Sequence, residues 1–522
     1  MCPSSKLILY LADPLFLPAG LGDYQFLMPN REMPCFSGSL KQKTLLMTIT
    51  SSVGPRFALS LSSLTAAIVW FNGGPGCSSM IGLTTGNGPI TFEGNTTRMI
   101  NNPYSWTKFG HVLYIDQPVG TGYSTVSETG PTIDNDVVTT YLYDWLKSFF
   151  AHFPHLQTKQ LYLAGESWGG VYVPHLASAI IDNQDSFPLN LQSMIAGDGA
   201  IGNGAALATV SIPKYVESQN SIIGMPDDIL AIFAEASETC GFDDILEQVQ
   251  YPPEGKISIP ADPEGINLKH RRDLGDVYNG TYNIHPTTPE EVREAIFSSA
   301  YGSCATFTTA MDYLNTRAGY GCGFNVYDIS DDCDDINYFN LVGEYFNQSD
   351  VQASLNVPNS SSQASPYFYC DQTGLNALYK TPAPAPAYFL FPDLVTSHNI
   401  SLHIYWGEND MLLNHIGAEL VLQNMTWNGE QGFSSPIDRP FYADNAAPSL
   451  VKNSNSNKNN PPGTCATPHA SADVEAGKWI SERGVTYHLF HGAGHSVFLK
   501  KPREMFAYMR DVVFSTTAPT KH

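Results

Sequence analysis

Short apolar runs alternate with a helical pattern between residues 66 and 182, and this rhythm constrains the fold more than any other feature. The runs 66–71, 111–116 and 161–166 are rich in β-branched and aromatic residues and end near Gly, Asn or Asp. Strand, helix, strand, helix in this order predicts an α/β fold, with a mainly parallel central sheet and helices on both faces. Sheets of this kind bind ligands at the carboxyl ends of their strands.

Helices and later strands follow from the same patterns. Apolar residues recur at helical spacing across 136–153, and Pro154 follows the last of them. A second helix is expected across 171–182. Three further strands are expected, the first of them weak, at 194–196, 402–406 and 485–490.

The rhythm breaks in the middle of the chain, which divides the expected fold. Residues 205–340 hold helical pieces, four cysteines and loops, and we expect an inserted cap region there. The first part of the core is then 35–204, preceded by an atypical N-terminal segment, 1–34. The second part is 341–522, which contains an Asn-rich surface loop near 452–463.

Composition limits the partners. Asp plus Glu number 50 against 27 Lys plus Arg, a formal net charge of -23. Such a surface repels phosphate backbones, so no nucleic acid partner is expected. No apolar stretch reaches the ~20 residues of a membrane span, so none is expected. Lys6 and the apolar residues after it form a candidate degenerate signal peptide, with a short apolar core and no clean cleavage site.

Cysteines and glycosylation sequons indicate the compartment. The nine cysteines include no Cys-x-x-Cys pair, so no metal or other cofactor is expected. Together with many Asn-x-Ser/Thr sequons they favour the secretory pathway, with a secreted or vacuolar protein, over a cytosolic protein with buried free cysteines. The sequons are at Asn95, Asn279, Asn347, Asn359, Asn399 and Asn424.

A candidate nucleophile, Ser167, lies in the sequence Gly-Glu-Ser-Trp-Gly-Gly directly after a predicted strand. The Gly-x-Ser-x-Gly pattern alone is more often a turn. A serine nucleophile needs a base within hydrogen-bond reach, and that base needs an orienting acid. Asp410 and His495 follow two later predicted strands. Serine, acid and histidine in this chain order, each at a strand's carboxyl end, are the α/β-hydrolase arrangement, so these three residues are the predicted catalytic triad.

Two neighbours compete with the predicted acid and base. Glu408 competes with Asp410 on position alone. His491 competes with His495, but it lies directly at the strand end, whereas the glycine-rich loop after it would present His495. The triad assignment therefore favours Asp410 and His495.

The stretch Trp-Phe-Asn-Gly-Gly-Pro-Gly-Cys-Ser-Ser, residues 70–79, is the most specific in the chain. Adjacent glycines before a proline let the backbone approach a ligand and direct N–H groups at it. The N–H groups of Gly74 and Trp168 are the predicted oxyanion hole. A plain tight turn between strand and helix is the alternative.

With these motifs the chain resembles the serine carboxypeptidases, a peptidase family on the α/β-hydrolase fold, and its fungal members in particular. The family removes single amino acids from peptide C-termini, so the resemblance implies a hydrolase that acts on peptide or protein C-termini through an acyl-enzyme. The resemblance spans roughly residues 66 to 500. It rests on WFNGGPGCSS, NPYSW, YIDQPVGTGYS, GESWGG, IGNG, NVYD, GEND and GAGH.

The resemblance also assigns residues around the triad. Asn72 and Glu166 are expected to bind the terminal carboxylate of the substrate. A glutamic acid donates a hydrogen bond only when protonated, which implies a preference for acid pH. Cys77 is expected to bond to Cys370. The four cap cysteines are expected to form two disulfides of open pairing, and Cys2, Cys35 and Cys465 stay unassigned.

Four departures from the family pattern stand out. Gly86 occupies the position where the family has a carboxylate-binding Glu, with Asn87 beside it as a partial substitute. The family's His-Met-Val-Pro is His-Ser-Val-Phe at 495–498. Leu413 replaces a frequent cysteine. The aromatic strand expected before WFNGG is not recognisable in 40–64.

Two other functions stay open at this stage. Acyltransferase relatives tend to carry Asp before the nucleophile, whereas this chain has Glu166, which favours the peptidase over an acyltransferase or esterase. Gly86 and the atypical N-terminus leave room for a non-catalytic relative, against which the intact triad argues. The oligomeric state does not follow from the sequence.

Overall fold

The structure is a computed structural model, and it describes part of the chain. The described segments are residues 9–12, 47–50, 66–124, 134–260, 285–298, 303–318, 324–331, 337–355, 357, 367–370, 378, 385–443 and 475–515. Within these segments, no helix combines the length and the apolar character that a membrane crossing requires.

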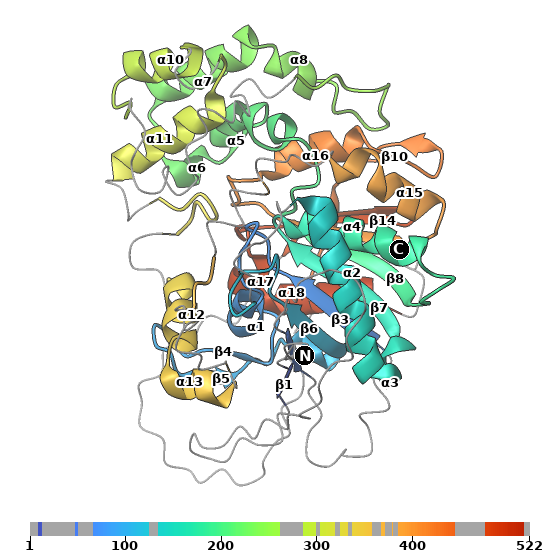
Figure 1. Cartoon of the computed structure of the whole chain (residues 1–522). Coiled ribbons are helices and arrows are strands. Elements are labelled where there is room, and N and C mark those ends of the chain that lie inside the picture. The colour runs from blue at the N-terminus through green and yellow to red at the C-terminus, as the bar shows by residue number, and fades with distance from the viewer. Residues whose placement is uncertain are drawn as a thin grey trace, which may run out of the picture.

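A ten-stranded sheet runs through the molecule (Figure 1) in the order β1-β2-β6-β3-β7-β8-β9-β14-β13-β12. The six strands from β6 to β14 are parallel to one another. The pairs β2–β6, β14–β13 and β13–β12 are antiparallel, so only the centre is purely parallel. The strands of this sheet are β1 (Leu9–Ala12), β2 (Met47–Thr50), β3 (Ala66–Phe71), β6 (Gly110–Ile115), β7 (Gln160–Glu166), β8 (Asn190–Gly197), β9 (Ser401–Gly407), β12 (Arg439–Phe441), β13 (Gly477–Glu482) and β14 (Val485–Phe490).

The mainly parallel sheet predicted from the sequence is confirmed. Strands β3 and β14 have the predicted bounds, β7 differs by one residue at its start, and β6 and β9 differ by one residue at each end. The weak strand is longer than expected, because β8 continues through polar residues at its start. The unplaced stretch 40–64 contains β2, which pairs with β6.

Alternate residues of β3 contact different layers, which explains why the strand is apolar throughout. Val69 and Phe71 belong to one apolar cluster, together with residues of α2 (Asn135–His152) and α4 (Gly169–Asp182). Ile68 and Trp70 belong to a second cluster on the other face. A parallel strand buried on both faces has to be apolar at every position.

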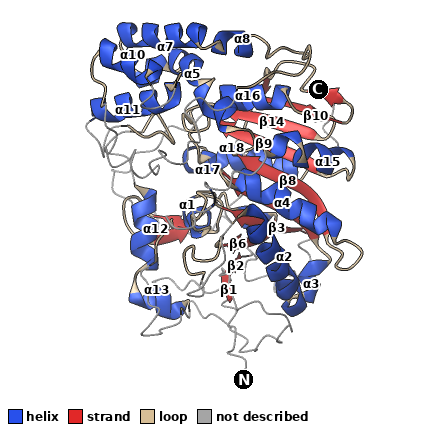
Figure 2. Ribbon diagram, turned by 45° about the horizontal axis from the view of Figure 1, so that its top comes forward, coloured by secondary structure: helices blue, strands red, loops and turns tan. Residues whose placement is uncertain are grey.

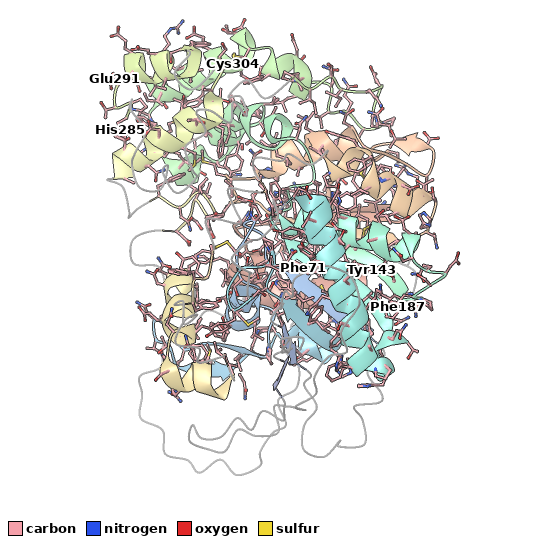
Figure 3. All side chains as sticks on the ribbon, viewed as in Figure 1. Phe71, Tyr143, Phe187, His285, Glu291 and Cys304 are labelled. Atoms are coloured by element: carbon pink, nitrogen blue, oxygen red, sulfur yellow. A yellow bond between two sulfur atoms is a disulfide. The ribbon has the colours of Figure 1, made fainter. Side chains whose placement is uncertain are left out.

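The covering helix α2 begins directly after a capping residue. Asp134 caps α2, because its Oδ1 accepts a hydrogen bond of 2.8 Å from the N–H of Val137. Helices α2 and α4 both lie within two residues of their predicted bounds. Phe71 and Tyr143, both labelled in Figure 3, belong to the apolar cluster on the face that α2 covers. The second face is covered by α1 (Met80–Thr85), α17 (Val497–Lys500) and α18 (Pro502–Tyr508).

A group of helices lies beyond the carboxyl edge of the sheet, at the top of Figures 1 and 2. It has an apolar cluster of its own, which includes Phe233, Ile296 and Met311. These residues fall inside the segment expected to be a cap, and that division of the chain stays a prediction. Its main helices are α5 (Ile212–Ser218), α7 (Asp227–Thr239), α8 (Phe242–Leu246), α10 (Pro289–Phe297) and α11 (Thr306–Ala318).

Shorter elements complete the described fold. Two small hairpins lie outside the main sheet. Their strands are β4 (Ile90–Phe92), β5 (Met99–Asn101), β10 (Thr426–Trp427) and β11 (Glu430–Gln431). The remaining α-helices are α3 (Pro154–Gln157), α6 (Asn220–Ile223), α12 (Tyr338–Phe346), α13 (Ser349–Ser354), α15 (Leu390–Thr396) and α16 (His415–Gln423).

Two disulfides tie distant segments together. Cys77 bonds to Cys370, as the family resemblance implies, so that prediction is confirmed. Cys240 bonds to Cys304, which resolves one of the two cap disulfides left open; Cys304 is labelled among the upper helices of Figure 3. Five cysteines lie outside the described residues: Cys2, Cys35, Cys322, Cys333 and Cys465.

Candidate active site

Ser167 lies in a sharp turn between β7 and α4, at the carboxyl edge of the sheet. Its φ is 62°, in the left-handed region that residues with a side chain rarely adopt. Its N–H donates to the carbonyl of Gly197 at 3.0 Å, and its own carbonyl accepts from Gly170 and Ala200. A serine held in this way between strand and helix is the nucleophile elbow of α/β hydrolases.

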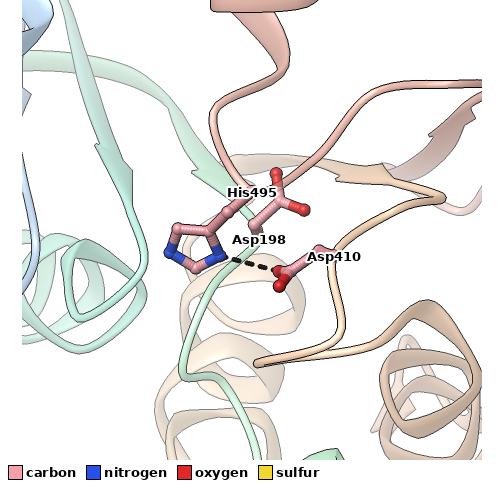
Figure 4. Close-up of side chains that lie close together, drawn as sticks. All are labelled: Asp198, Asp410 and His495. Atoms are coloured by element: carbon pink, nitrogen blue, oxygen red, sulfur yellow. Dashed lines mark hydrogen bonds and ion pairs between the residues drawn. The ribbon is translucent and has the colours of Figure 1, made fainter. Parts of the chain in front are cut away.

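His495 and Asp410 form a buried pair beside this edge. His495 Nδ1 lies 2.7 Å from Asp410 Oδ2 (Figure 4). Asp410 Oδ1 accepts from the N–H groups of Leu412 at 2.9 Å and Leu413 at 3.2 Å. His495 Nε2 is buried and has no hydrogen-bond partner among the described residues. The ring is therefore held through Nδ1, and Nε2 remains as a base.

The pKa of His495 reflects two opposing effects. Burial lowers the pKa by disfavouring the imidazolium, but the charge of Asp410 and its hydrogen bond raise it, with a smaller contribution from Glu166. The net pKa is above the ordinary histidine value. An acid that orients the histidine and stabilises its charged form is the role of the third triad member.

The loop 324–331, which carries the Asn-Val-Tyr-Asp motif, holds both parts of this pair. The carbonyl of Tyr327 accepts from the N–H of His495 at 2.7 Å, and the two rings lie 5.1 Å apart. The carbonyl of Val326 accepts from the N–H groups of Met411 and Leu412, each at 3.1 Å. One loop thus positions the segments that carry the acid and the base.

The competing residues Glu408 and His491 form a separate ion pair. His491 Nδ1 lies 3.2 Å from Glu408 Oε2, and both side chains are about 30% exposed. His491 also lies 3.5 Å from Glu475. This partly exposed pair leaves the buried pair of Asp410 and His495 as the better triad geometry.

The glycine loop lies directly against the nucleophile turn. A Cβ atom built on Gly73 would come 2.4 Å from the backbone nitrogen of Trp168 and 2.6 Å from Ser167 Cβ, so only glycine allows this approach. Gly74 follows with a φ of 106°. This close approach brings the two residues of the predicted oxyanion hole, Gly74 and Trp168, to the same place.

Asp116, in the Tyr-Ile-Asp-Gln-Pro motif, supports the glycine loop from below. Its Oδ1 accepts from Ser78 Oγ at 2.6 Å and from the N–H of Ser79 at 2.9 Å. Ser79 Oγ in turn accepts from the N–H of Asn72 at 3.1 Å. Burial raises the pKa of Asp116 to about 6, although these hydrogen bonds lower it.

Asn72 directly follows β3 and Glu166 is the last residue of the adjacent parallel strand β7, one residue beyond the paired Phe71 and Gly165. Asn72 Oδ1 accepts from Trp70 Nε1 at 2.7 Å and from the N–H of Gly82 at 3.0 Å, which fixes the amide. Its Nδ2 has no partner within the described segments and is left for a ligand. Glu166 Oε1 accepts from Ser496 Oγ at 2.9 Å.

Burial sets the protonation of Glu166. It raises the pKa of this carboxyl group to about 7, although His495 and the Ser496 hydrogen bond lower it. In the family pattern a second carboxyl group, at position 86, would share a proton with Glu166 and so raise one of the two pKa values. Burial by itself keeps Glu166 neutral at acid pH without that group.

The missing acid at position 86 has a steric counterpart. A Cβ built on Gly86 would lie 1.7 Å from Phe498 Cδ2, so the phenyl ring fills this space. Asn87 is fully buried, and its side-chain amide has no hydrogen-bond partner in the described part of the chain. Asn102, from the Asn-Pro-Tyr-Ser-Trp motif, donates to the carbonyls of Gly86 and Gly88 and holds the segment.

Sequence reasoning missed Asp198, Ser496 and Tyr327 as residues of this site. Asp198 follows β8 and forms a cluster with Asp410 and His495, in which one polar side-chain atom from each residue lies within 4.8 Å of the others (Figure 4). Asp198 could have been recognised as a carboxylate directly after a predicted strand, but the sequence pattern of that strand was weak. The roles of Ser496 and Tyr327 depend on contacts between distant segments, which no local pattern announces.

The parallel sheet, the strained serine and the buried histidine–aspartate pair define an α/β hydrolase. Within that class, the chain belongs to the serine carboxypeptidase family, whose model matches residues 61–515. The chain is 38% identical over 457 residues to a "Carboxypeptidase Y homolog" of Arthroderma benhamiae, a match that covers 85% of this chain and 84% of the relative.

Two further fungal carboxypeptidases are similar to this chain, one in sequence and one in fold. A "Pheromone-processing carboxypeptidase kex1" of Talaromyces stipitatus is 28% identical over 84% of this chain and 59% of its own length. The fold is similar to the crystal structure of Kex1(delta)p, described as a prohormone-processing carboxypeptidase from Saccharomyces cerevisiae. That match has a TM-score of 0.63 at 19% identity and covers 93% of this chain and 89% of the other.

Proposed function

We propose that this chain hydrolyses the C-terminal peptide bond of peptides and proteins through an acyl-enzyme on Ser167, with a preference for acid pH. The observation that carries the proposal is the burial of Glu166, the residue directly before the nucleophile in the chain. Burial raises the pKa of this carboxyl group to about 7, so the acid is neutral at acid pH. A neutral acid there serves a substrate that ends in a carboxylate, which an ester or amide lacks.

The chemistry runs in two halves. Ser167 Oγ attacks the carbonyl carbon, and its proton passes to His495 Nε2, which then donates it to the nitrogen of the leaving amino acid as the C–N bond breaks. Water then attacks the resulting ester and gives its proton to His495 Nε2. His495 passes that proton to Ser167 Oγ as the bond between Oγ and the acyl carbon breaks, which releases the shortened peptide and restores the serine. The N–H groups of Gly74 and Trp168 are assigned to the negative charge on the carbonyl oxygen. Asp410 stabilises the imidazolium.

Recognition of the C-terminus depends on two donors. Asn72 Nδ2 and protonated Glu166 both donate to the terminal carboxylate. Because the pKa of Glu166 is about 7, the acid is neutral below that pH and becomes charged above it. A charged Glu166 would repel the substrate carboxylate, so peptide turnover falls as the pH rises through about 7.

The proposed location is the secretory pathway, with a secreted or vacuolar protein. Two disulfides support an oxidising compartment. The acid preference of the proposed reaction agrees with a compartment of low pH. The proposed partners are peptide and protein C-termini, with neither nucleic acid nor a cofactor involved.

One assay separates the three candidate functions. Purified protein is incubated with an N-blocked dipeptide, its C-terminal amide and its ethyl ester, and release of the C-terminal residue is measured. We expect turnover of the free acid at acid pH, and no turnover of any substrate by Ser167→Ala, whose labelling by a serine-directed phosphonate is also lost. Cleavage of the ester alone would favour an esterase or acyltransferase. Silence with all three would favour a non-catalytic relative.

A further inference from the structure

Asp198 brings a second carboxyl group next to the triad acid. It lies at the carboxyl end of β8, with a φ of 42°, and is fully buried, as is Asp410. One carboxylate oxygen of Asp198, one of Asp410 and one ring nitrogen of His495 lie within 4.8 Å of one another (Figure 4). No substrate group needs to reach Asp198, so the reaction described above does not use it.

Only one oxygen of Asp198 is paired. Oδ1 accepts from the N–H of Gly407 at 2.8 Å. Oδ2 is buried and has no hydrogen-bond donor among the described residues. Both oxygens of Asp410, by contrast, accept from N–H donors of Leu412, Leu413 and His495. A buried carboxylate oxygen without a donor is costly, and so is a second negative charge beside Asp410.

We propose that Asp198 is a neutral carboxylic acid whose Oδ2 proton faces Asp410, and that it is a positioning residue of the triad. With this proton, Oδ2 of Asp198 donates a hydrogen bond to Asp410. A single negative charge, that of Asp410, then remains next to His495. The proton on Asp198 stays there throughout catalysis, while the proton of Ser167 moves to His495 and on to the leaving group. The proposal rests on the proposed reaction, because it assigns a role within the same triad.

The surroundings of Asp198 favour the neutral form. Burial raises its pKa well above the ordinary aspartate value, and the charge of Asp410 adds to this, while the Gly407 N–H opposes it. Glu166 raises it further. The other titratable groups around Asp198 are His495 and the hydroxyls of Tyr215, Tyr405 and Tyr487.

A bound cation would neutralise the cluster less well than a proton. The two oxygens of Asp410 already accept from three N–H groups, and His495 Nδ1 is one of those donors. A metal ion in the cluster would displace the hydrogen bond that orients His495. A proton on Asp198 leaves this bond intact.

Asp198→Asn provides the direct test. The amide keeps an acceptor for Gly407 and a donor for Asp410, and asparagine tolerates a positive φ. Measured with the ethyl ester, which has no terminal carboxylate, kcat should stay close to that of the unmodified protein. The acid limb of the pH profile, which reports the ionisation of His495, should not move, because the substitution removes no charge.

Asp198→Gly tests the donor without adding backbone strain. Glycine accepts the positive φ, but it leaves Asp410 without the neighbouring proton. Loss of a hydrogen bond to a charged group should lower kcat by roughly ten- to a hundred-fold, and asparagine should restore it. A thermal unfolding transition measured for each variant establishes that the variant is folded before its kcat is compared with that of the unmodified protein.

Several outcomes would overturn the proposal. If Asp198 were ionised, Asp198→Asn would move the acid limb to lower pH by about one unit or more, since a charge within a few ångströms would be lost. A folded but inactive Asp198→Asn would show that the charge is needed. Unchanged kcat in Asp198→Gly would show that Asp198 has no role. If activity were lost on dialysis against EDTA and restored by zinc, the group that neutralises the cluster would be a bound cation and not a proton on Asp198.

The control variant is Glu419→Gln. Burial raises the pKa of this carboxyl group to about 7, and its other influences come from Tyr251 and Lys478. It should leave both kcat and the pH profile unchanged. The pH dependence of the phosphonate labelling rate also reports the ionisation of His495, and it needs no substrate. A protein that fails to cleave peptides would therefore overturn the proposed function, while the labelling rate would still test the role of Asp198.

Discussion

The phenyl ring of Phe498 occupies the space that a side chain at Gly86 would need. A Cβ at position 86 would come within 1.7 Å of this ring, which also packs edge-on against Trp70 at 5.6 Å. Two of the departures from the family pattern, Gly86 and Phe498, are therefore in direct contact and complement each other in size. Gly86 has a φ of -158° and a ψ of -64°, and the phenyl ring is the nearest obstacle to a side chain at this position.

This contact changes how the missing acid has to be tested. Gly86→Glu alone should destabilise the protein, by about 1–3 kcal/mol for an overpacked core, rather than restore a second acid. Gly86→Glu combined with Phe498→Ala should recover much of this loss. In the double variant the ratio of free-acid to amide turnover should rise, by roughly ten- to a hundred-fold for a gained charge-assisted bond. Phe498→Ala alone is the control.

Denaturant unfolding, and turnover at the pH of maximal activity, would check this prediction. If Gly86→Glu were as stable as the unmodified protein, the ring would not be the obstacle. If the folded double variant showed no change in the ratio, the acid at position 86 would be irrelevant to recognition of the C-terminus.

The alkaline limb of peptide turnover should belong to Glu166. Its pKa, raised to about 7 by burial, means that the donor is present below that pH and is lost above it. Glu166→Gln donates a hydrogen bond at every pH, so the fall in kcat/KM above about pH 7 should disappear for the free acid. The amide substrate, which has no carboxylate, should show no such limb in either protein. A limb that persists in Glu166→Gln would assign the titration to another group.

The two disulfides should differ in their effect on catalysis. The cysteines of the Cys77–Cys370 pair are 293 residues apart and those of the Cys240–Cys304 pair are 64 apart. Replacing either pair by alanines should cost roughly 2–5 kcal/mol of unfolding free energy, with about 1 kcal/mol more for the longer loop in the entropic model. Only the first pair anchors the glycine loop, so only its loss should lower kcat. An equal fall in kcat for both pairs would contradict this assignment.

Sequons should differ in glycan occupancy according to their side chains. Asn95 and Asn399 are exposed. Asn424 is part-buried, and its amide pairs with both the N–H and the carbonyl of Ile257. We expect glycans at Asn95 and Asn399 and none at Asn424 in protein secreted from a eukaryotic host. Peptide mapping after glycosidase treatment measures this, and a fully occupied Asn424 would show that the Ile257 contact forms after glycosylation or not at all.

The sequence predicted the parallel sheet well, because strands buried on both faces are short apolar runs with clear ends. It also predicted which acid and histidine lie together, since Asp410 and His495 each follow such a strand. Asp198 escaped because β8 begins with polar residues and its end was not recognised as a site. The fit of Phe498 against Gly86 escaped for another reason: each residue was visible as an oddity, but only folding brings positions so far apart in the chain into contact.

The carbonyls of Val326 and Tyr327 have a consequence for how this protein becomes competent. They hold the segments of Asp410 and His495, yet they belong to neither half of the sheet. The ten strands can therefore be complete while the acid and base are still loose. Enzymatic activity therefore requires this loop to be docked as well as the sheet to be formed, and we expect a protease cut near residues 324–331 to abolish activity while leaving the sheet intact.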